Sequence, residues 1–202
     1  DTVMQQPLTA VIVGTGFGGI GMAIRLRQAG ITDFILLEKA GQVGGTWRDN
    51  TYPGAACDVP SPLYSFSFEQ DFDWPRFYSG HADIHRYQLH CVRKYGLMPH
   101  IRLNTEVRRA AFDEASGLWS VETAAGDRLQ ARALITATGQ LNRPALPKIP
   151  GLGRFGGKVF HSSRWDHGHD LGGRKVAVIG TGASAIQFVS HVVAKAGHMT
   201  LF

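Results

Sequence analysis

The feature that most constrains this 202-residue chain is a glycine-rich turn that occurs twice, 166 residues apart. Residues 10–19 read Ala-Val-Ile-Val-Gly-Thr-Gly-Phe-Gly-Gly, and residues 176–185 read Val-Ala-Val-Ile-Gly-Thr-Gly-Ala-Ser-Ala. In each copy a short β-branched and apolar run precedes the turn, and apolar residues at helical spacing follow it. A strand, a glycine turn and a helix in this order open a βαβ unit. The sequence therefore predicts an α/β fold with two Rossmann-like dinucleotide-binding units.

The first turn has the glycine spacing that a dinucleotide pyrophosphate requires. Gly14 permits the tight turn, Gly16 lets the backbone approach the pyrophosphate, and Gly19 lets the helix pack closely on the strand. A second predicted strand, residues 33–38, ends in Glu38, where an acid hydrogen-bonds an adenosine ribose and repels a 2′-phosphate. The first site is therefore predicted to bind FAD or NAD and not NADP. The alternative is a tight packing turn in an α/β domain that binds no dinucleotide.

The second turn, 180–185, is the variant in which Ala185 takes the position of the third glycine. Two dinucleotide sites in one chain imply hydride transfer between two cofactors, typically a nicotinamide and a flavin. The residues that select NADP or NAD would follow Phe202, so the sequence does not distinguish between these two cofactors.

The remaining predicted elements lie between the two turns and after the second one. Between the turns these are an irregular stretch over 41–80, a helix over 82–95, a β-meander over 106–136, a separate buried strand over 134–138 and a Pro/Gly-rich linker over 140–174. The second turn follows a predicted strand over 175–179, and after it a helix is expected over 186–195 and a further strand from 199. No 18-residue apolar run suggests a membrane span, and no basic stretch precedes an apolar core as in a secretory signal.

Charge and cysteine content narrow the function classes further. The net charge is +5, but Lys and Arg are scattered, which disfavours nucleic-acid binding and suits small anions such as nucleotide phosphates. Cys57 and Cys91 form no CxxC pair, so a disulfide scaffold and a cysteine zinc site are not expected. We expect reduced thiols and a cytoplasmic protein.

Three further segments carry motifs that together resemble one enzyme family. They read Gly44-Gly45-Thr46-Trp47 followed by Tyr52-Pro53-Gly54-Ala55 and Cys57-Asp58, then Ala137-Thr138-Gly139, and then Phe155-x-Gly157-x-x-x-His161-x-x-x-Trp165-Asp166. The last segment is similar, at every specified position, to the fingerprint FxGxxxHxxxW followed by Pro or Asp. From about residue 9 to its end the chain resembles the N-terminal portion of the Baeyer–Villiger monooxygenases. Trp165 separates it from the related flavin-containing N- and S-oxygenases, which carry tyrosine there.

The resemblance implies an FAD-binding domain over 1–140, a linker with the fingerprint over 141–173, and the truncated start of an NADP-binding domain over 174–202. It also implies cofactor contacts. Those to FAD are Gly14, Gly16, Phe17, Gly19, Glu38, Gly45, Thr46, Trp47, Tyr64 and the backbone at Val107; those to NADPH are Gly180, Thr181, Gly182, Ala183, Ser184, Ala185 and Gln187. Ala56 departs from the arginine that several relatives carry at this position.

Asp58 is the residue to which the resemblance assigns chemistry. The matching aspartate of the family lies near the flavin, beside an arginine that stabilises the peroxyflavin. The alternative is a turn or cap carboxylate. His161 and Trp165 are expected to position the linker rather than to transfer protons. A metal site at His161, His167 and His169 is not expected, because no acid or cysteine accompanies them at helical spacing.

The activity implied by the resemblance is an NADPH- and O2-dependent flavin monooxygenase that converts a ketone into an ester or lactone through a flavin C4a-peroxide. Its partners would be a small ketone and O2, without nucleic acid or membrane. A flavin N- or S-oxygenase and a non-catalytic FAD/NADP-binding module remain alternatives. A disulfide reductase would need a redox cysteine pair. We expect the 202 residues to be a fragment that does not turn over alone.

Overall fold

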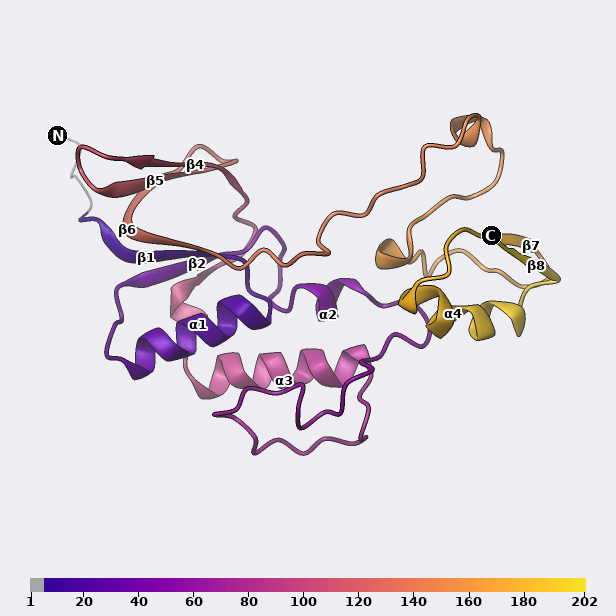
Figure 1. Ribbon diagram of the computed structural model, residues 1–202, viewed down its shortest axis with the longest axis horizontal. Helices are drawn as coiled ribbons and strands as arrows, with labels where there is room; N and C mark the ends of the chain where they lie inside the picture. Colours follow the sequence, from indigo (N-terminus) through magenta and orange to yellow (C-terminus); the bar gives the residue numbers. More distant parts are fainter. Residues whose placement is uncertain (1–5) are drawn as a thin grey trace. The chain divides into compact units, whose positions relative to one another are not determined.

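The computed structural model describes residues 6–202, which form two compact units (Figure 1). The first unit contains residues up to Arg48 together with His85–Asn142, and the second contains Asp49–Ile84 together with Arg143–Phe202. The segment 49–84 therefore belongs to the same unit as the end of the chain, although it lies between two parts of the first unit in sequence.

The first unit is built on a six-stranded sheet in the order β3-β2-β1-β6-β5-β4. Its strands are β1 (Leu8–Val13), β2 (Phe34–Leu37), β3 (Ile101–Arg102), β4 (Val107–Asp113), β5 (Leu118–Thr123) and β6 (Arg128–Thr136); its helices are α1 (Phe17–Gln28), α2 (Thr46–Asp49) at its boundary, most of α3 (His81–Lys94) and the short η1 (Met98–His100). β1 pairs in parallel with both β2 and β6, whereas β4, β5 and β6 form an antiparallel meander. The predicted βαβ unit, the helix near 82–95 and the meander are confirmed.

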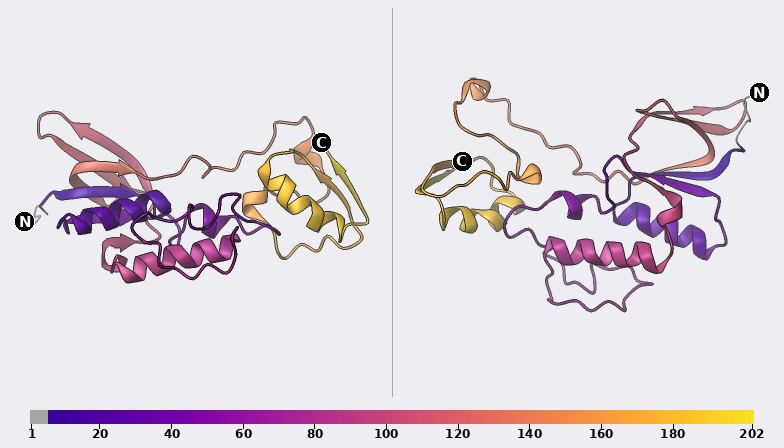
Figure 2. Two further views of the ribbon diagram at one scale, coloured as in Figure 1. Left: turned by 60° about the horizontal axis from the view of Figure 1, so that its bottom comes forward. Right: turned by 180° about the vertical axis from the view of Figure 1, so that it is seen from behind.

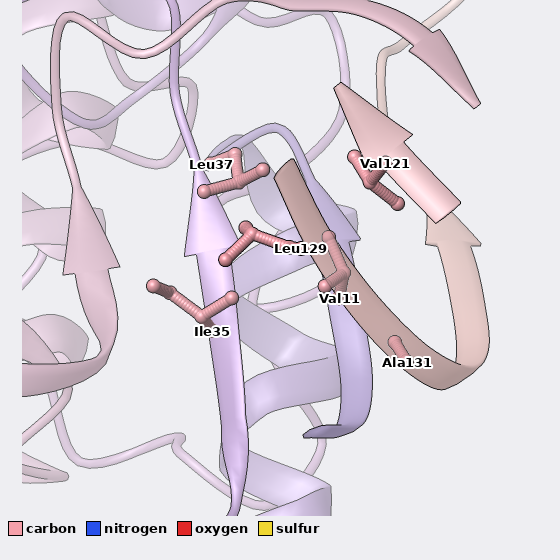
Figure 3. Close-up of a cluster of buried hydrophobic side chains, with 6 residues drawn as sticks. All are labelled: Val11, Ile35, Leu37, Val121, Leu129 and Ala131. Atoms are coloured by element: carbon pink, nitrogen blue, oxygen red, sulfur yellow. The ribbon is translucent and has the colours of Figure 1, made fainter. Parts of the chain in front are cut away.

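Both faces of this sheet carry apolar side chains. On one face, residues of the meander fold back over the parallel strands (Figure 3), and the cluster consists of Val11, Ile35, Leu37, Val121, Leu129 and Ala131. On the other side of the parallel strands lie α1 and α3 (Figure 2), with Ile20 and Ile24 of α1 and Tyr87 of α3 fully buried. The Phe17 and Tyr87 rings stack at 6.0 Å between centroids.

One predicted element is wrong. The separate strand expected over 134–138 is the second half of β6, which runs unbroken from Arg128 to Thr136. The strand is continuous because Ala131 pairs with Trp119 of β5 on one side and with Leu8 of β1 on the other. β6 therefore joins the antiparallel meander to the parallel strands. This half is also only partly buried, since Leu134 and Ile135 are intermediate and Thr136 is exposed.

The second unit repeats the strand–turn–helix pattern on a smaller scale. Its elements are β7 (Lys175–Val178), α4 (Ala183–Val193), β8 (His198–Leu201) and the short turns η2 (Leu152–Arg154) and η3 (Ser162–Arg164). β7 and β8 pair in parallel, and their crossover is α4. The helix begins three residues earlier than expected, directly after the glycine turn. The hydrophobic core of the second unit consists of Tyr52, Ala55, Val178, Ala185, Phe188 and Val192. Across residues 6–202, no helix has both the length and the apolarity that a membrane crossing requires.

Candidate dinucleotide sites

The first glycine turn lies between the end of β1 and the start of α1. A Cβ atom at Gly14 would lie 2.5 Å from the carbonyl oxygen of Ala137, and one at Gly19 would lie 1.9 Å from that of Gly14. Both positions therefore exclude any side chain. A Cβ atom at Gly16, in contrast, would meet only the Cα atom of Gly45, at 3.9 Å. The backbone at Gly16 thus borders space that a ligand can approach.

The N-terminus of α1 is suited to an anion. Gly16 is its N-cap residue, no side chain caps it, and no acidic residue lies in its first turn. The first backbone N–H groups of a helix have no partner within the helix, and the helix dipole favours negative charge at this end. Together with the space at Gly16, this arrangement fits a pyrophosphate.

The predicted Gly44–Trp47 segment lies beside this turn. The Gly44 N–H donates to the Thr15 carbonyl at 3.0 Å, and a Cβ atom at Gly45 would lie 3.2 Å from the Gly16 Cα atom. His85 of α3 contacts the start of the same segment, since its Nε2 atom lies 2.9 Å from the Val43 carbonyl oxygen. The structure thus brings together two motifs that are about 30 residues apart in the sequence.

The carboxylate of Glu38 is buried and makes four contacts with the protein. Its Oε2 atom accepts hydrogen bonds from the Thr15 N–H at 3.1 Å and the Thr15 hydroxyl at 2.7 Å. Its Oε1 atom accepts one from the Ala40 N–H at 2.9 Å and lies 3.3 Å from the Arg48 guanidinium. A carboxylate has about four lone-pair sites, so this acid organises the turn around it. Contact with a ribose stays a prediction, and any ribose hydroxyl must share these oxygens.

Thr15 and Arg48 are functional candidates that sequence reasoning missed. Thr15 is completely buried although it is polar, and it belongs to the Gly-Thr-Gly pattern found in both turns. Arg48 donates to the Gln42 carbonyl at 2.5 Å in addition to its contact with Glu38. The only signal in the sequence is that Arg48 directly follows the Gly44–Trp47 motif.

The second glycine turn presents a similar helix end. Gly180 has φ +110°, Gly182 is the N-cap residue of α4, and a Cβ atom at either would meet no atom within 4 Å. No side chain caps α4, and no acidic residue lies in its first turn. Thr181 and Ala183 are exposed, whereas Ala185 is buried in the core. This turn also fits a pyrophosphate.

The side chain of Gln187 binds protein groups, and its expected contact with the nicotinamide cofactor stays a prediction. Its Oε1 atom accepts from the Tyr52 hydroxyl at 2.8 Å, and its Nε2 atom donates to the Ala56 carbonyl at 2.9 Å. The segment that precedes Asp58 is thereby attached to α4. The side chain of Asp58 itself is exposed. The neighbouring Cys57 is buried, and this burial raises the pKa of its thiol.

The remaining predicted FAD contacts divide between the units. Val107 is half-buried at the start of β4 in the first unit. Tyr64 is half-buried in the second unit, in an irregular segment where its N–H donates to the Pro60 carbonyl at 3.0 Å. Their contact with a flavin stays a prediction.

The fingerprint residues hold the linker of the second unit. His161 is the N-cap residue of η3, and its Nδ1 atom accepts the Ser163 N–H at 3.1 Å. The Nδ1 atom therefore acts as the capping acceptor in this contact. Trp165 packs against Phe188 of α4, with 5.3 Å between ring centroids.

The other fingerprint residues lie nearby in the linker. Asp166 pairs with Lys158 at 2.7 Å, and this hydrogen bond lowers the pKa of the Asp166 carboxyl. A Cβ atom at Gly157 would lie 2.5 Å from the ring of Phe155, which is largely exposed. Within residues 6–202, no group of three or more His, Cys, Asp or Glu side chains is arranged to hold a metal.

Comparison with known proteins places these features in a family. Residues 11–202 match the family described as pyridine nucleotide-disulphide oxidoreductase. The chain belongs to this family. Its members need not share one reaction, since a fold supports many chemistries. The only two cysteines, Cys57 and Cys91, form no CxxC pair, so the disulphide chemistry in the family's description has no redox pair here.

Several of the proteins similar to this chain are named as monooxygenases. A Baeyer–Villiger monooxygenase of Streptomyces coelicolor is 53% identical over 98% of this chain and 38% of its own length. A steroid monooxygenase bound to NADP is 38% identical, with a TM-score of 0.89 over 98% of this chain and 39% of that one. The OTEMO complex with FAD and NADP is 33% identical, with a TM-score of 0.91 over 98% and 39%. The resemblance drawn from the motifs is confirmed, and the chain spans about 38% of the length of the curated relative.

Proposed function

We propose that the full protein is an NADPH- and O2-dependent Baeyer–Villiger-type flavin monooxygenase. A ketone, NADPH, a proton and O2 would be converted into an ester or lactone, NADP+ and water. When bound, FAD supplies the redox chemistry that carries two electrons from NADPH to O2. The related monooxygenases named above support this proposal, and so does the similar OTEMO structure, which holds both FAD and NADP.

The observation that carries the proposal is the pair of uncapped, acid-free helix N-termini, α1 and α4. Each follows a glycine turn with open space at its middle glycine, Gly16 or Gly182. One such turn would fit any dinucleotide protein. Two in one chain suit an enzyme that passes electrons between two dinucleotides.

The assignment of cofactors to turns follows from charge. Glu38 places a buried carboxylate at the end of β2, and this charge opposes the 2′-phosphate of NADPH. We therefore assign FAD to the turn at Gly16 and NADPH to the turn at Gly182. The Gly44–Trp47 segment beside the first turn would contribute to the same FAD site.

Asp58 would supply charge near the reacting atoms. It follows a segment that is hydrogen-bonded to Gln187 and Ser79, and its own side chain is exposed. A carboxylate in this place would orient a cationic group that stabilises negative charge developing in the reaction. The proposed role is electrostatic, so the aspartate itself need not transfer a proton.

Product analysis with labelled oxygen tests the proposal directly. Full-length protein is incubated with NADPH, 18O2 and a panel containing ketones, a tertiary amine and a thioether. The expected result is an ester or lactone that carries one 18O atom, formed only when both NADPH and a ketone are present.

Three outcomes would overturn the proposal in different ways. Oxides of the amine and the thioether without any ester would indicate an N- or S-oxygenase. Bound FAD without NADPH-dependent oxygen uptake would indicate a binding module. A protein that retains no flavin would refute the FAD assignment at Gly16.

A further inference from the structure

The carboxamide of Gln187 holds the backbone of Ala56 at two points, 131 residues away in the sequence. Its Nε2 atom donates to the Ala56 carbonyl at 2.9 Å, and its Oε1 atom receives the Ala56 N–H in a weak contact at 3.5 Å. Because the backbone of Ala56 offers one donor and one acceptor, this pairing also fixes which end of the carboxamide is oxygen.

Tyr52 provides a third attachment of the same segment to α4. Its hydroxyl donates to Gln187 Oε1 at 2.8 Å, and its ring meets Phe188 edge-on at 5.9 Å. Tyr52 is only 8% exposed. On folding, its hydroxyl therefore replaces a hydrogen bond to water with the hydrogen bond to Gln187 Oε1. An unmatched hydroxyl at such a site is costly, which makes the bond sensitive to loss of either partner.

Gly54 allows the segment to lie directly on α4. It has φ +80°, and a Cβ atom there would lie 2.8 Å from the Gln187 carbonyl oxygen and 2.8 Å from the ring of His191. Both the backbone conformation and the close approach exclude a side chain. The backbone of segment 52–56 therefore packs directly against α4 at Gly54.

Residues 79–81 hold the segment in a second set of contacts. Ala56 forms an antiparallel bridge with Gly80, and the Cys57 N–H donates to the Ser79 carbonyl at 3.0 Å. The His81 N–H donates to the Ala55 carbonyl at 2.9 Å. The backbone is thus fixed up to the residue before Asp58.

We propose that Gln187 is a positioning residue that sets the location of Asp58 relative to the helix end at Gly182. This inference rests on the proposed function, in which Gly182 borders NADPH and Asp58 lies near the reaction centre. Three of the four hydrogen-bonding positions of the carboxamide are committed to Tyr52 and Ala56. Gln187 therefore acts on the reaction through the segment that it holds.

The predicted consequence concerns the fate of NADPH. If segment 52–56 is no longer held against α4, Asp58 is misplaced. A misplacement of about 1 Å can lower the rate of a reaction step on the order of 100-fold. NADPH, a proton and O2 then give NADP+ and hydrogen peroxide, and the ketone is left unchanged. The binding of either cofactor need not change.

The test compares three variants of the full-length protein with a matched control. Gln187→Met keeps the length of the side chain and removes all its hydrogen bonds. Gln187→Glu keeps an acceptor for Tyr52 and places a second acceptor against the Ala56 carbonyl. Tyr52→Phe removes one bond. Ser190→Ala, an exposed position on the same helix, is the control.

Four quantities are measured: flavin content, NADP+ dissociation constant, ester formed per NADPH, and hydrogen–deuterium exchange of residues 52–58. For Gln187→Met we expect full flavin content, a dissociation constant within about threefold of wild type, and an ester yield lowered about tenfold, with matching peroxide. Exchange at 52–58 should accelerate. Gln187→Glu should behave similarly, Tyr52→Phe should show a smaller and non-additive effect, and Ser190→Ala should show none.

Two results would overturn the inference. A tenfold weaker NADP+ affinity with unchanged ester yield would make Gln187 a direct cofactor ligand. Unchanged exchange at 52–58 in Gln187→Met would show that the carboxamide does not hold the segment. If the wild-type protein forms no ester, the proposed function fails by itself, and the exchange measurement still decides whether Gln187 fixes the segment.

Discussion

Thr15 and Glu38 are joined by two hydrogen bonds to a single carboxylate oxygen, from the backbone N–H at 3.1 Å and from the hydroxyl at 2.7 Å. Thr15 is completely buried, and Glu38 is 5% exposed. The end of β2 is thereby tied to the turn that follows β1. The acid expected to contact a ribose thus also holds the glycine turn that follows β1.

Replacing Thr15 should therefore affect both stability and cofactor retention. Thr15→Val removes the hydroxyl and leaves a buried carboxylate oxygen with one partner fewer, so the free energy of unfolding should fall by about 1–3 kcal/mol. Urea unfolding and flavin absorbance measure the two effects. Thr15→Ser keeps the hydroxyl and should remain close to wild type. A Thr15→Val protein with wild-type stability and full flavin content would show that the hydroxyl bond to Glu38 contributes little.

The two glycine turns should be separable by substitution. Gly16→Val places a side chain where its Cβ atom is 3.9 Å from the nearest heavy atom, so the protein should fold but lose FAD. Gly182→Val should keep FAD and lose NADP+ binding. Each variant is the control for the other, with flavin absorbance and NADP+ titration as readouts. A Gly16→Val protein with normal flavin content would contradict the assignment of FAD to this turn.

Asp58 should be needed for product formation and not for folding. Asp58→Ala in the full-length protein should retain FAD and lose a factor of about 10²–10³ in ester formation, as expected when one electrostatic stabiliser is removed. Ester and peroxide yields per NADPH provide the measurement. If the ester yield does not change, Asp58 is a turn residue and nothing more.

His161 should act through its cap on η3. His161→Ala removes the acceptor for the Ser163 N–H and should slow flavin reduction or uncouple it without a change in pH optimum. His161→Asn offers a side-chain oxygen at the same N-cap position and should recover part of the rate, because Asn is a favourable N-cap residue. Loss of an ionisation from the pH–rate profile would indicate instead a catalytic base at this position.

The Lys158–Asp166 pair should be visible in a titration. The pKa of Asp166 is lowered by its hydrogen bond to Lys158, so the pair stabilises the linker above the unfolded pKa of about 3.9. This stabilisation is lost as the pH falls through the lower, folded pKa. NMR titration should show the carboxyl midpoint rising in Lys158→Met. It should also rise in wild type at high salt, because exposed pairs are screened. A midpoint that is the same in both proteins would show that the ion pair is absent in solution.

Local patterns predicted most of the fold, because glycine spacing and apolar periodicity are short-range signals. The strand at 8–13, its turn, α1 and Glu38 could all be placed from such signals. The sequence does not indicate β3, because this strand has two residues, too few for any periodicity. β6 was divided because its two halves pair with different strands, and the sequence does not reveal the change of partner at Ala131.

The site could be predicted only in part, for a similar reason. Motifs identified Gly16, Gly182 and the segment before Asp58. The side-chain bonds that connect them join residues far apart in the chain, such as Gln187 and Ala56 or Arg48 and Glu38. A glutamine one turn into an amphipathic helix gives no sign in the sequence that it binds a backbone 131 residues earlier.

The place of β6 in the sheet has a consequence for synthesis on the ribosome. β1 reaches its final neighbour only when β6 exists, since Leu8 pairs with Ala131, 123 residues later. At about 5–20 residues per second, the edge of β1 stays unpaired for roughly 6–25 s after it has been translated. An unpaired strand edge invites pairing with other chains. The first unit therefore passes through a period in which chaperone binding to the nascent chain would protect β1, and this period ends when Thr136 clears the exit tunnel.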